Sequence, residues 1–230
     1  MKILAADTST DILTVGVCAD GVTLAHAVVQ CGRAHSERLL DTAQWALAEA
    51  GLALTDLDAL AIAHGPGSFT GLRIGVASWK GLALGANLPL VAVPTLDAMA
   101  RTAVACRGPL CVALDAKMGE VFGAWFEAVP DGAARRGPDQ VCPMAALVDQ
   151  APAGAVYLGD GAARYEEVIR SHDATAAVLP ETVAGPRAWA VALEGAARIA
   201  AGAPTDAALV SPVYLRKSQA EVNRERALLA

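Results

Sequence analysis

The chain has 230 residues, 54% of them hydrophobic and 18% charged, so it can bury a sizeable core and is not expected to be disordered. Its net charge of −6 argues against a protein that grips nucleic acid by itself, because phosphate binding depends on clustered Lys and Arg. The five cysteines include no C-x-x-C pair and are expected to be reduced thiols. The apolar run near the start is too short for a signal peptide or a membrane span, which predicts a soluble cytoplasmic protein.

The first hundred residues predict an antiparallel meander followed by alternating helices and strands. Strands are expected at 2–6, 13–18 and 22–29, with Asp20-Gly21 as a hairpin turn. Apolar residues then recur at helical spacing over 35–50. A strand at 57–63, a helix at 72–86, a strand at 88–93 and a helix capped by Thr95 and ending near 101 follow. This order indicates a mixed sheet with helices on its faces.

The second half repeats this pattern less fully. A strand pair is predicted at 110–114 and 120–126, followed by a surface stretch at 130–138, a short strand at 156–158 and a helix at 187–201. We therefore predict an N-terminal subdomain over 1–100, a smaller C-terminal subdomain over 101–218, and a charged tail over 219–230.

The most glycine-rich stretch is HGPGSFTGLRIG, residues 64–75, directly behind the predicted strand at 57–63. It is not a P-loop, because Leu72 and Arg73 stand where that motif needs Gly and Lys. The spacing from Gly65 to Gly71 is one residue too long for the dinucleotide-binding fingerprint. A proline between glycines also fits a shaped turn between a strand and a helix, so the residues alone leave a phosphate role and a structural role open.

The helix predicted after this turn is rich in small residues. Gly71 and Gly75, then Gly81 and Gly85, each lie four residues apart. Because glycine costs about 1 kcal/mol inside a helix, these positions indicate that another element approaches closely. That element can belong to the same chain or to a second chain.

Acidic turns occur in both halves, DTSTD at 7–11 and DAKMGE at 115–120. Each can be an ordinary Asx turn, or can serve phosphate or Mg²⁺-bound water. One acidic hairpin in each half indicates the duplicated layout of actin, sugar kinases and heat-shock ATPases, in which nucleotide phosphates lie between the hairpins. No two histidines have metal-ligand spacing, and Ser68 lacks the context of a nucleophile elbow.

Six segments in order resemble the TsaB (YeaZ) family: MKILAADTST at 1–10, AHSERLL at 34–40, HGPGSFTGLRIG at 64–75, PTLD at 94–97, DAKMGEV at 115–121 and PVYLR at 212–216. The resemblance covers nearly the whole chain. It implies an α/β actin-like ATPase fold of two subdomains, the second reduced, and a role in forming threonylcarbamoyladenosine in tRNAs that read codons starting with A.

The related TsaD proteins transfer the threonylcarbamoyl group and hold a metal through an H-x-x-x-H pair. Here His35 is followed four residues later by Leu39, so that pair is absent. The resemblance therefore implies a scaffold without catalytic residues or a metal, which pairs with a TsaD-like protein, recruits a TsaE-like ATPase, and meets tRNA only through the complex.

The resemblance also implies which residues serve this role. TsaB-like chains form homodimers, and pair with TsaD, through two helices that would be 35–50 and 72–86 here. The interface residues would be His35, Leu39, Leu40, Phe69, Gly71, Arg73, Ile74 and Gly75. Asp7, Thr8, Ser9 and Thr10 would be the contacts for a nucleotide phosphate, with ATP or ADP at the interface with TsaD and no cofactor required by the isolated chain.

Two rival functions stay open. One is a self-sufficient actin-fold ATPase or sugar kinase that uses Asp7 and Asp115 around Mg²⁺, although GDG at 159–161 is a poor adenosine-binding motif. The other is a glycoprotease-like peptidase, for which the chain offers neither a metal pair nor a supported nucleophile.

Overall fold

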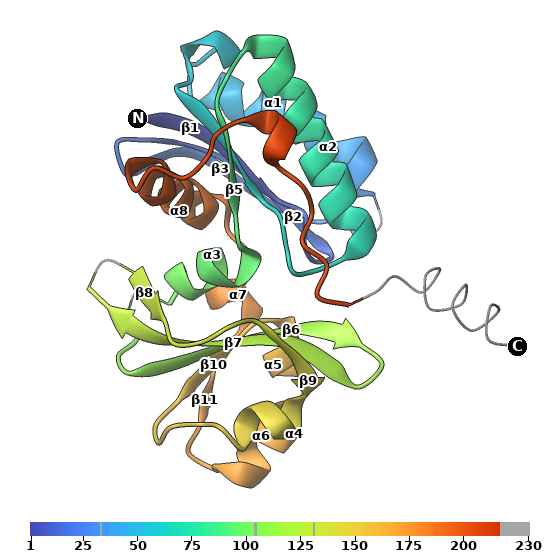
Figure 1. Ribbon diagram of the computed structural model, residues 1–230, viewed down its shortest axis with the longest axis vertical. Helices are drawn as coiled ribbons and strands as arrows, with labels where there is room; N and C mark the ends of the chain where they lie inside the picture. Colours follow the sequence, from blue (N-terminus) through green and yellow to red (C-terminus); the bar gives the residue numbers. More distant parts are fainter. Residues whose placement is uncertain (33, 104, 131, 217–230) are drawn as a thin grey trace, which may run out of the picture.

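The computed structural model describes residues 1–32, 34–103, 105–130 and 132–216; the predicted tail at 219–230 lies outside the described residues. Two sheets, each with helices on both faces, lie one above the other in the view of Figure 1. None of the helices in the described part of the chain has the length and apolarity needed to cross a membrane.

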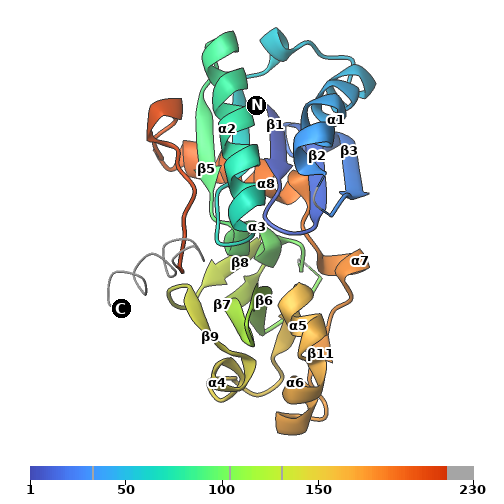
Figure 2. The ribbon, with the colours of Figure 1, turned by 90° about the vertical axis from the view of Figure 1, so that its right-hand side faces the viewer.

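The first sheet has five strands in the order β3-β2-β1-β4-β5. Its strands are β1 (Lys2–Asp7), β2 (Ile12–Ala19), β3 (Val22–Gln30), β4 (Ala59–Ala63) and β5 (Leu90–Val93). The first three form the predicted meander, and β4 and β5 are parallel to β1. Helices α1 (His35–Glu49) and α2 (Phe69–Ala86) cover one face, and α8 (Ala188–Ala200) covers the other (Figures 1 and 2).

Strand β1 shows why this sheet is covered on both sides. Side chains alternate between the faces of a strand. Leu4 and Ala6 therefore pack in the core beneath α1 and α2, whereas Ile3 and Ala5 pack in the core beneath α8. All four are buried, so β1 reads as one continuous apolar run.

The second sheet contains β11, β10, β6, β7 and β8 in that order, with β9 paired to β7. Its strands are β6 (Pro109–Lys117), β7 (Glu120–Val129), β8 (Gly132–Arg135), β9 (Gln140–Pro143), β10 (Val156–Leu158) and β11 (Ala177–Val178). Its helices are α3 (Thr95–Arg101), α4 (Met144–Val148), α5 (Asp160–Arg164), α6 (Glu166–His172) and α7 (Glu181–Ala184). Helix α3 packs on one face, and α4, α5 and α6 pack on the other.

The elements predicted from periodicity are present, with shifted ends. Helix α2 begins at Phe69, three residues earlier than predicted, because Ser68 caps it. Thr95 does not cap α3: Pro94 is the N-cap, and the Thr95 hydroxyl accepts a hydrogen bond from Gly65 N–H. The stretch at 130–138, predicted as irregular surface, contains β8.

Helix α8 returns the chain to the first sheet after the second sheet is complete. It packs against β1, β2, β4 and β5, although it lies about a hundred residues beyond α3 in sequence. Arg101 of α3 and Glu194 of α8 form an ion pair, with Nε and Oε2 2.7 Å apart, that joins a helix of the second sheet to a helix of the first. The predicted C-terminal subdomain, 101–218, thus includes a helix that belongs by its contacts to the first sheet.

Candidate functional site

The glycine-rich stretch 64–75 forms the turn from β4 into α2 and holds the first hairpin of the chain. Ser68 N–H donates to the Ser9 carbonyl at 2.7 Å, and the Thr8 hydroxyl donates to the Gly71 carbonyl at 2.8 Å. Both partners lie in the turn between β1 and β2. Three backbone N–H groups of this stretch, those of Gly65, Ser68 and Gly71, are thus engaged within the chain itself.

The two glycine pairs of α2 have different surroundings. A Cβ atom on Gly71 would overlap the Thr8 carbonyl oxygen, and one on Gly75 would overlap the Thr8 hydroxyl. Gly81 and Gly85 have no atom within 4 Å of the position of a Cβ and are exposed. The close approach inferred from sequence is therefore intramolecular at the first pair, and the second pair lies open on the surface.

The four residues predicted to contact a phosphate are buried beneath the start of α2. Asp7 and Thr8 are 0% exposed, Ser9 is 2% and Thr10 is 7%. Ser9 N–H donates to Asp7 Oδ1 at 2.7 Å, which is the Asx-turn arrangement. A phosphate could reach these groups only after the first turn of α2 moved away.

Beneath this turn lies a buried polar cluster made of Asp7, Ser9, Thr14 and His35. One polar atom of each has no hydrogen-bond partner among the described residues: Asp7 Oδ2, Ser9 Oγ, Thr14 Oγ1 and His35 Nε2. Burial raises the pKa of Asp7. The hydrogen bonds from Ser9 and the charge of His35 lower it, but burial has the larger effect, so the pKa is raised overall. Because a buried polar group without a partner costs free energy, these four groups are a liability for stability within the first half.

The second acidic turn is closed by ion pairs. Asp115 accepts a hydrogen bond from the Lys117 ammonium at 2.9 Å, and Arg164 lies 3.3 Å from the same carboxylate. Burial raises the pKa of Asp115, but the hydrogen bonds and charge of Lys117, with the charge of Arg164, lower it overall. Asp160 accepts a hydrogen bond from Asp115 N–H at 2.9 Å, and burial raises the pKa of Asp160. Within the described residues, no group of three or more His, Cys, Asp or Glu could hold a metal ion.

The predicted interface residues divide into buried and exposed sets. His35 and Leu39 are 4% and 0% exposed and pack inward, and Gly71 and Gly75 are also buried. Residues 35, 39, 43 and 46 form the face of α1 that covers the sheet, and Gly71 and Gly75 lie against Thr8. These four residues therefore offer almost no exposed surface in this conformation, and their role at an interface stays a prediction. Leu40, Arg73, Ile74 and Phe69 remain wholly or partly exposed.

Arg73 and Phe69 lie in a small surface stack with Tyr214. The Arg73 guanidinium lies 3.8 Å from the centre of the Phe69 ring, and its Nε donates to the Tyr214 hydroxyl at 3.1 Å. The Phe69 and Tyr214 rings are 4.5 Å apart. This stack joins the start of α2 to the segment that leads out of the described chain, a contact that no sequence pattern indicated.

Further apolar residues are exposed on α1 and α2. Leu40, Trp45 and Leu84 are 50%, 45% and 69% exposed. On α2, Ala77, Gly81 and Gly85 extend the exposed stripe at helical spacing. We call these six residues the outer face; α1 and α2, which carry it, are neighbours in the fold (Figure 2). On α1, Leu40 and Trp45 are five residues apart and lie on opposite flanks of the helix. The sequence did not predict that Trp45 and Leu84 are exposed, because their buried neighbours Ala46 and Ala83 also fit an apolar stripe.

Similarity to known proteins identifies the family of this chain. Residues 29–224 match the model of the family described as "TsaD: tRNA N6-adenosine threonylcarbamoyltransferase". The chain is 46% identical over 134 residues to the tRNA threonylcarbamoyladenosine biosynthesis protein TsaB of Escherichia coli. The chain belongs to the TsaB (YeaZ) family. The alignment with the E. coli TsaB covers 57% of this chain and 58% of that protein, so it spans little more than half of either.

Solved structures extend the likeness to the whole TsaB-family chain. YeaZ from Pseudomonas aeruginosa matches with a TM-score of 0.79 and 29% identity, over 93% of this chain and 99% of that chain. The ROK hexokinase from Thermus thermophilus matches with a TM-score of 0.50 and 14% identity, over 88% of this chain and 100% of that chain. The second likeness shows the fold alone. Together with the two mixed sheets, it confirms the predicted actin-like ATPase fold.

Proposed function

We propose that this chain takes part in tRNA threonylcarbamoyladenosine biosynthesis as a non-catalytic subunit that pairs with a TsaD-like protein. Membership of the TsaB family supports the pathway, since the E. coli relative is named for it. The match to the TsaD family model supports the partner, because two chains of one fold can present equivalent helices to each other in a pseudo-symmetric pair.

The outer face of α1 and α2 is the observation that supports this pairing. It places three large apolar side chains and two uncrowded glycines on adjacent helices. Glycine and alanine let the backbone of a partner helix approach closely, and Trp is enriched among residues that dominate binding energy. We propose that the same face pairs two copies of this chain into a homodimer when the partner is absent.

The proposed assembly also contains an ATPase and a nucleotide. A TsaE-like ATPase would join the pair, and ATP or ADP would bind at the interface between this chain and the TsaD-like protein. Residues 7–10 are buried in this conformation, so a nucleotide contact with them would need the turn to become exposed. With a net charge of −6, the chain would leave tRNA binding to its partners.

Leu84→Glu tests the pairing, with Val22→Glu as the matched control. The two residues are similarly exposed, 69% and 61%, but Val22 lies at the start of β3, away from α2. Leu84→Glu should abolish capture of a TsaD-like protein in a pull-down and shift the isolated chain toward monomer in sedimentation. Val22→Glu should leave both unchanged. Equal capture by both variants would contradict the proposed face.

Reconstitution tests the pathway separately. The TsaD-like protein, the TsaE-like ATPase, the threonylcarbamoyl donor and tRNA are combined with and without this chain, and modified nucleoside is measured. We expect modification to stop when the chain is omitted. Full modification of the tRNA in the absence of this chain would contradict the proposed function, whatever the result of the pull-down.

A further inference from the structure

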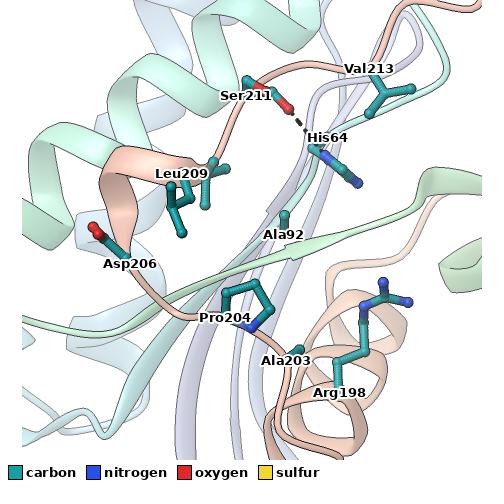
Figure 3. Close-up of a pocket in the computed structure, with 10 residues that line it drawn as sticks. His64, Ala92, Arg198, Ala203, Pro204, Asp206, Leu209, Ser211 and Val213 are labelled. Carbon is teal, nitrogen blue, oxygen red and sulfur yellow. Dashed lines mark hydrogen bonds between the residues drawn. The ribbon is translucent and has the colours of Figure 1, made fainter.

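A pocket of about 260 Å³ lies between β5, α8 and the segment 203–213 that follows α8 (Figure 3). We call this segment the strap. The pocket is lined by His64, Ala92, Arg198, Ala203, Pro204, Asp206, Leu209, Val210, Ser211 and Val213. Pockets for drug-sized ligands measure about 300–1,000 Å³, so this pocket lies just below that range and has room for a small metabolite.

The strap is tied down at several points, so the pocket is preformed. Leu90 N–H donates to the Thr205 carbonyl at 2.9 Å, and Val213 N–H donates to the His64 carbonyl at 2.7 Å. Between these ties, the Lys80 ammonium of α2 donates to the carbonyl of Val210 at 3.0 Å. The strap is thus held by hydrogen bonds at residues 205 and 213, and the part between them lies away from the edge of β5.

His64 presents a hydrogen-bond acceptor. Its Nδ1 lies 3.1 Å from the Ser211 carbonyl, and because a carbonyl only accepts, Nδ1 carries the proton. Burial lowers the pKa of His64, and the nearby charge of Arg198 lowers it further, while Asp97 and Asp139 act in the opposite direction. The neutral ring therefore leaves Nε2 as an acceptor. Figure 3 shows this second nitrogen pointing away from the strap, on the side from which Arg198 extends.

Arg198 presents unused donors. Its Nε is buried and has no hydrogen-bond partner within the described residues. Its Nη1 forms an ion pair with Glu194 Oε1 at 3.7 Å, a separation too long for a hydrogen bond. In Figure 3 the side chain rises from α8 toward His64. A guanidinium with free donors at the side of a pocket favours a carboxylate.

The edge of β5 supplies a third polar group. Leu90 N–H points away from β4, toward the strap, and Ala92 has the same direction because strand backbone groups alternate. In the part of the chain that the structure describes, no hydrogen bond satisfies Ala92 N–H. Pro204, Leu209 and Val213 form an apolar part of the wall. Asp206 also lines the pocket, and its Oδ1 accepts a hydrogen bond from Ala208 N–H at 2.8 Å.

We propose that this pocket binds a small hydroxycarboxylate, with the carboxylate on Arg198 and Ala92 N–H and the hydroxyl donating to His64 Nε2. A hydroxyl fits better than an ammonium at His64, because the Arg198 charge disfavours a second cation there. This site is independent of the pairing through the outer face, which lies on the other two helices of the first sheet.

Three probes of similar size separate the parts of the proposal. L-lactate carries both groups, propionate lacks the hydroxyl, and lactamide lacks the charge. Each is titrated into the ¹⁵N-labelled chain, and the amide signals of Ala92 and the strap are followed by NMR. Lactate should shift these signals saturably, propionate should bind about tenfold more weakly, and lactamide should not saturate.

Variants then assign the groups. Arg198→Gln should weaken lactate binding about tenfold or more. Arg170→Gln, which removes from α6 an arginine that is 47% exposed against 36% for Arg198, should leave lactate binding unchanged. His64→Gln should reduce lactate to the affinity of propionate without altering propionate. Equal binding of all three probes, no saturation with lactate, or full binding by Arg198→Gln would each overturn the proposal. Unchanged β5 signals before titration verify that each variant keeps the pocket.

Discussion

The two ends of α2 carry the same spacing of glycines and use it in opposite ways. At the first turn, Gly71 and Gly75 let the backbone of Thr8 lie against the helix. Toward the other end, the positions of a Cβ on Gly81 and Gly85 have no atom of the described residues within 4 Å. A pair of glycines four residues apart thus indicates close approach, but only the fold decides whether the approaching element is part of the same chain.

The difference follows from what lies beneath each end of the helix. The first turn of α2 sits over the turn between β1 and β2, whose polar residues are covered by it. The later turns pass along the sheet, where Trp79 and Ala83 fill the space toward the core and the glycines face outward. One helix therefore completes the core of its own subdomain at one end and offers a partner surface along the rest.

Gly71→Ala should have the largest effect on stability. Its Cβ would overlap the Thr8 carbonyl oxygen, which belongs to a buried backbone and cannot move aside easily. We expect the free energy of unfolding, measured with denaturant, to fall by about 3 kcal/mol. Gly85→Ala, in the same helix with open space around it, is the control. A Gly71→Ala variant as stable as the Gly85→Ala variant would show that the contact with Thr8 is not tight.

Thr8→Val should have the next largest effect. It keeps the shape of the side chain but removes the buried hydrogen bond of 2.8 Å to the Gly71 carbonyl. The free energy of unfolding should fall by about 1 kcal/mol. Thr70→Val, an exposed change at the start of α2, serves as the comparison and should leave stability nearly unaltered.

Gly81→Ala should act in the opposite direction. Alanine is a better helix former, and no atom obstructs its methyl group. We expect unfolding to become harder by about 0.5–1 kcal/mol. If the outer face pairs with a TsaD-like protein, the same variant should bind that partner more weakly. A variant that is more stable and also binds normally would confine the partner surface to other residues.

The smallest effects concern pH and distinguish the two acidic turns. Burial raises the pKa of Asp7 above its value in the unfolded chain, so its contribution is fully present below the ordinary aspartate pKa and is lost as pH rises. The lowered pKa of Asp115 gives a contribution that is present above the ordinary pKa and is lost as pH falls. Denaturant unfolding of Asp7→Asn and Asp115→Asn between about pH 3 and pH 7 should therefore differ from the parent chain with opposite slopes. Parallel slopes would contradict this contrast.

The sequence predicted the fold better than the site. Regular periodicity located the strands of the meander and α1, α2 and α8, because each buries a continuous apolar face. The short helices α4 to α7 escaped prediction, because four to seven residues carry too little periodicity. On α1, Leu39 and Leu40 are adjacent and equally apolar, yet one is in the core and the other is exposed.

The pocket illustrates a separate limit. His64 and Ser211, which meet across it, are 147 residues apart, and no local pattern connects them. Arg198 appears in the sequence as an ordinary charge near the end of a helix. Only the folded position of the strap shows that these side chains converge on one space.

The return of α8 to the first sheet has a consequence for how the chain is made. The second sheet is an insertion in the first subdomain, which stays incomplete until α8 and the strap have been synthesised. Until then, the apolar face of β1 formed by Ile3 and Ala5 has no cover. The part of the protein that is translated first therefore acquires its last covering helix only after the whole second sheet has been translated.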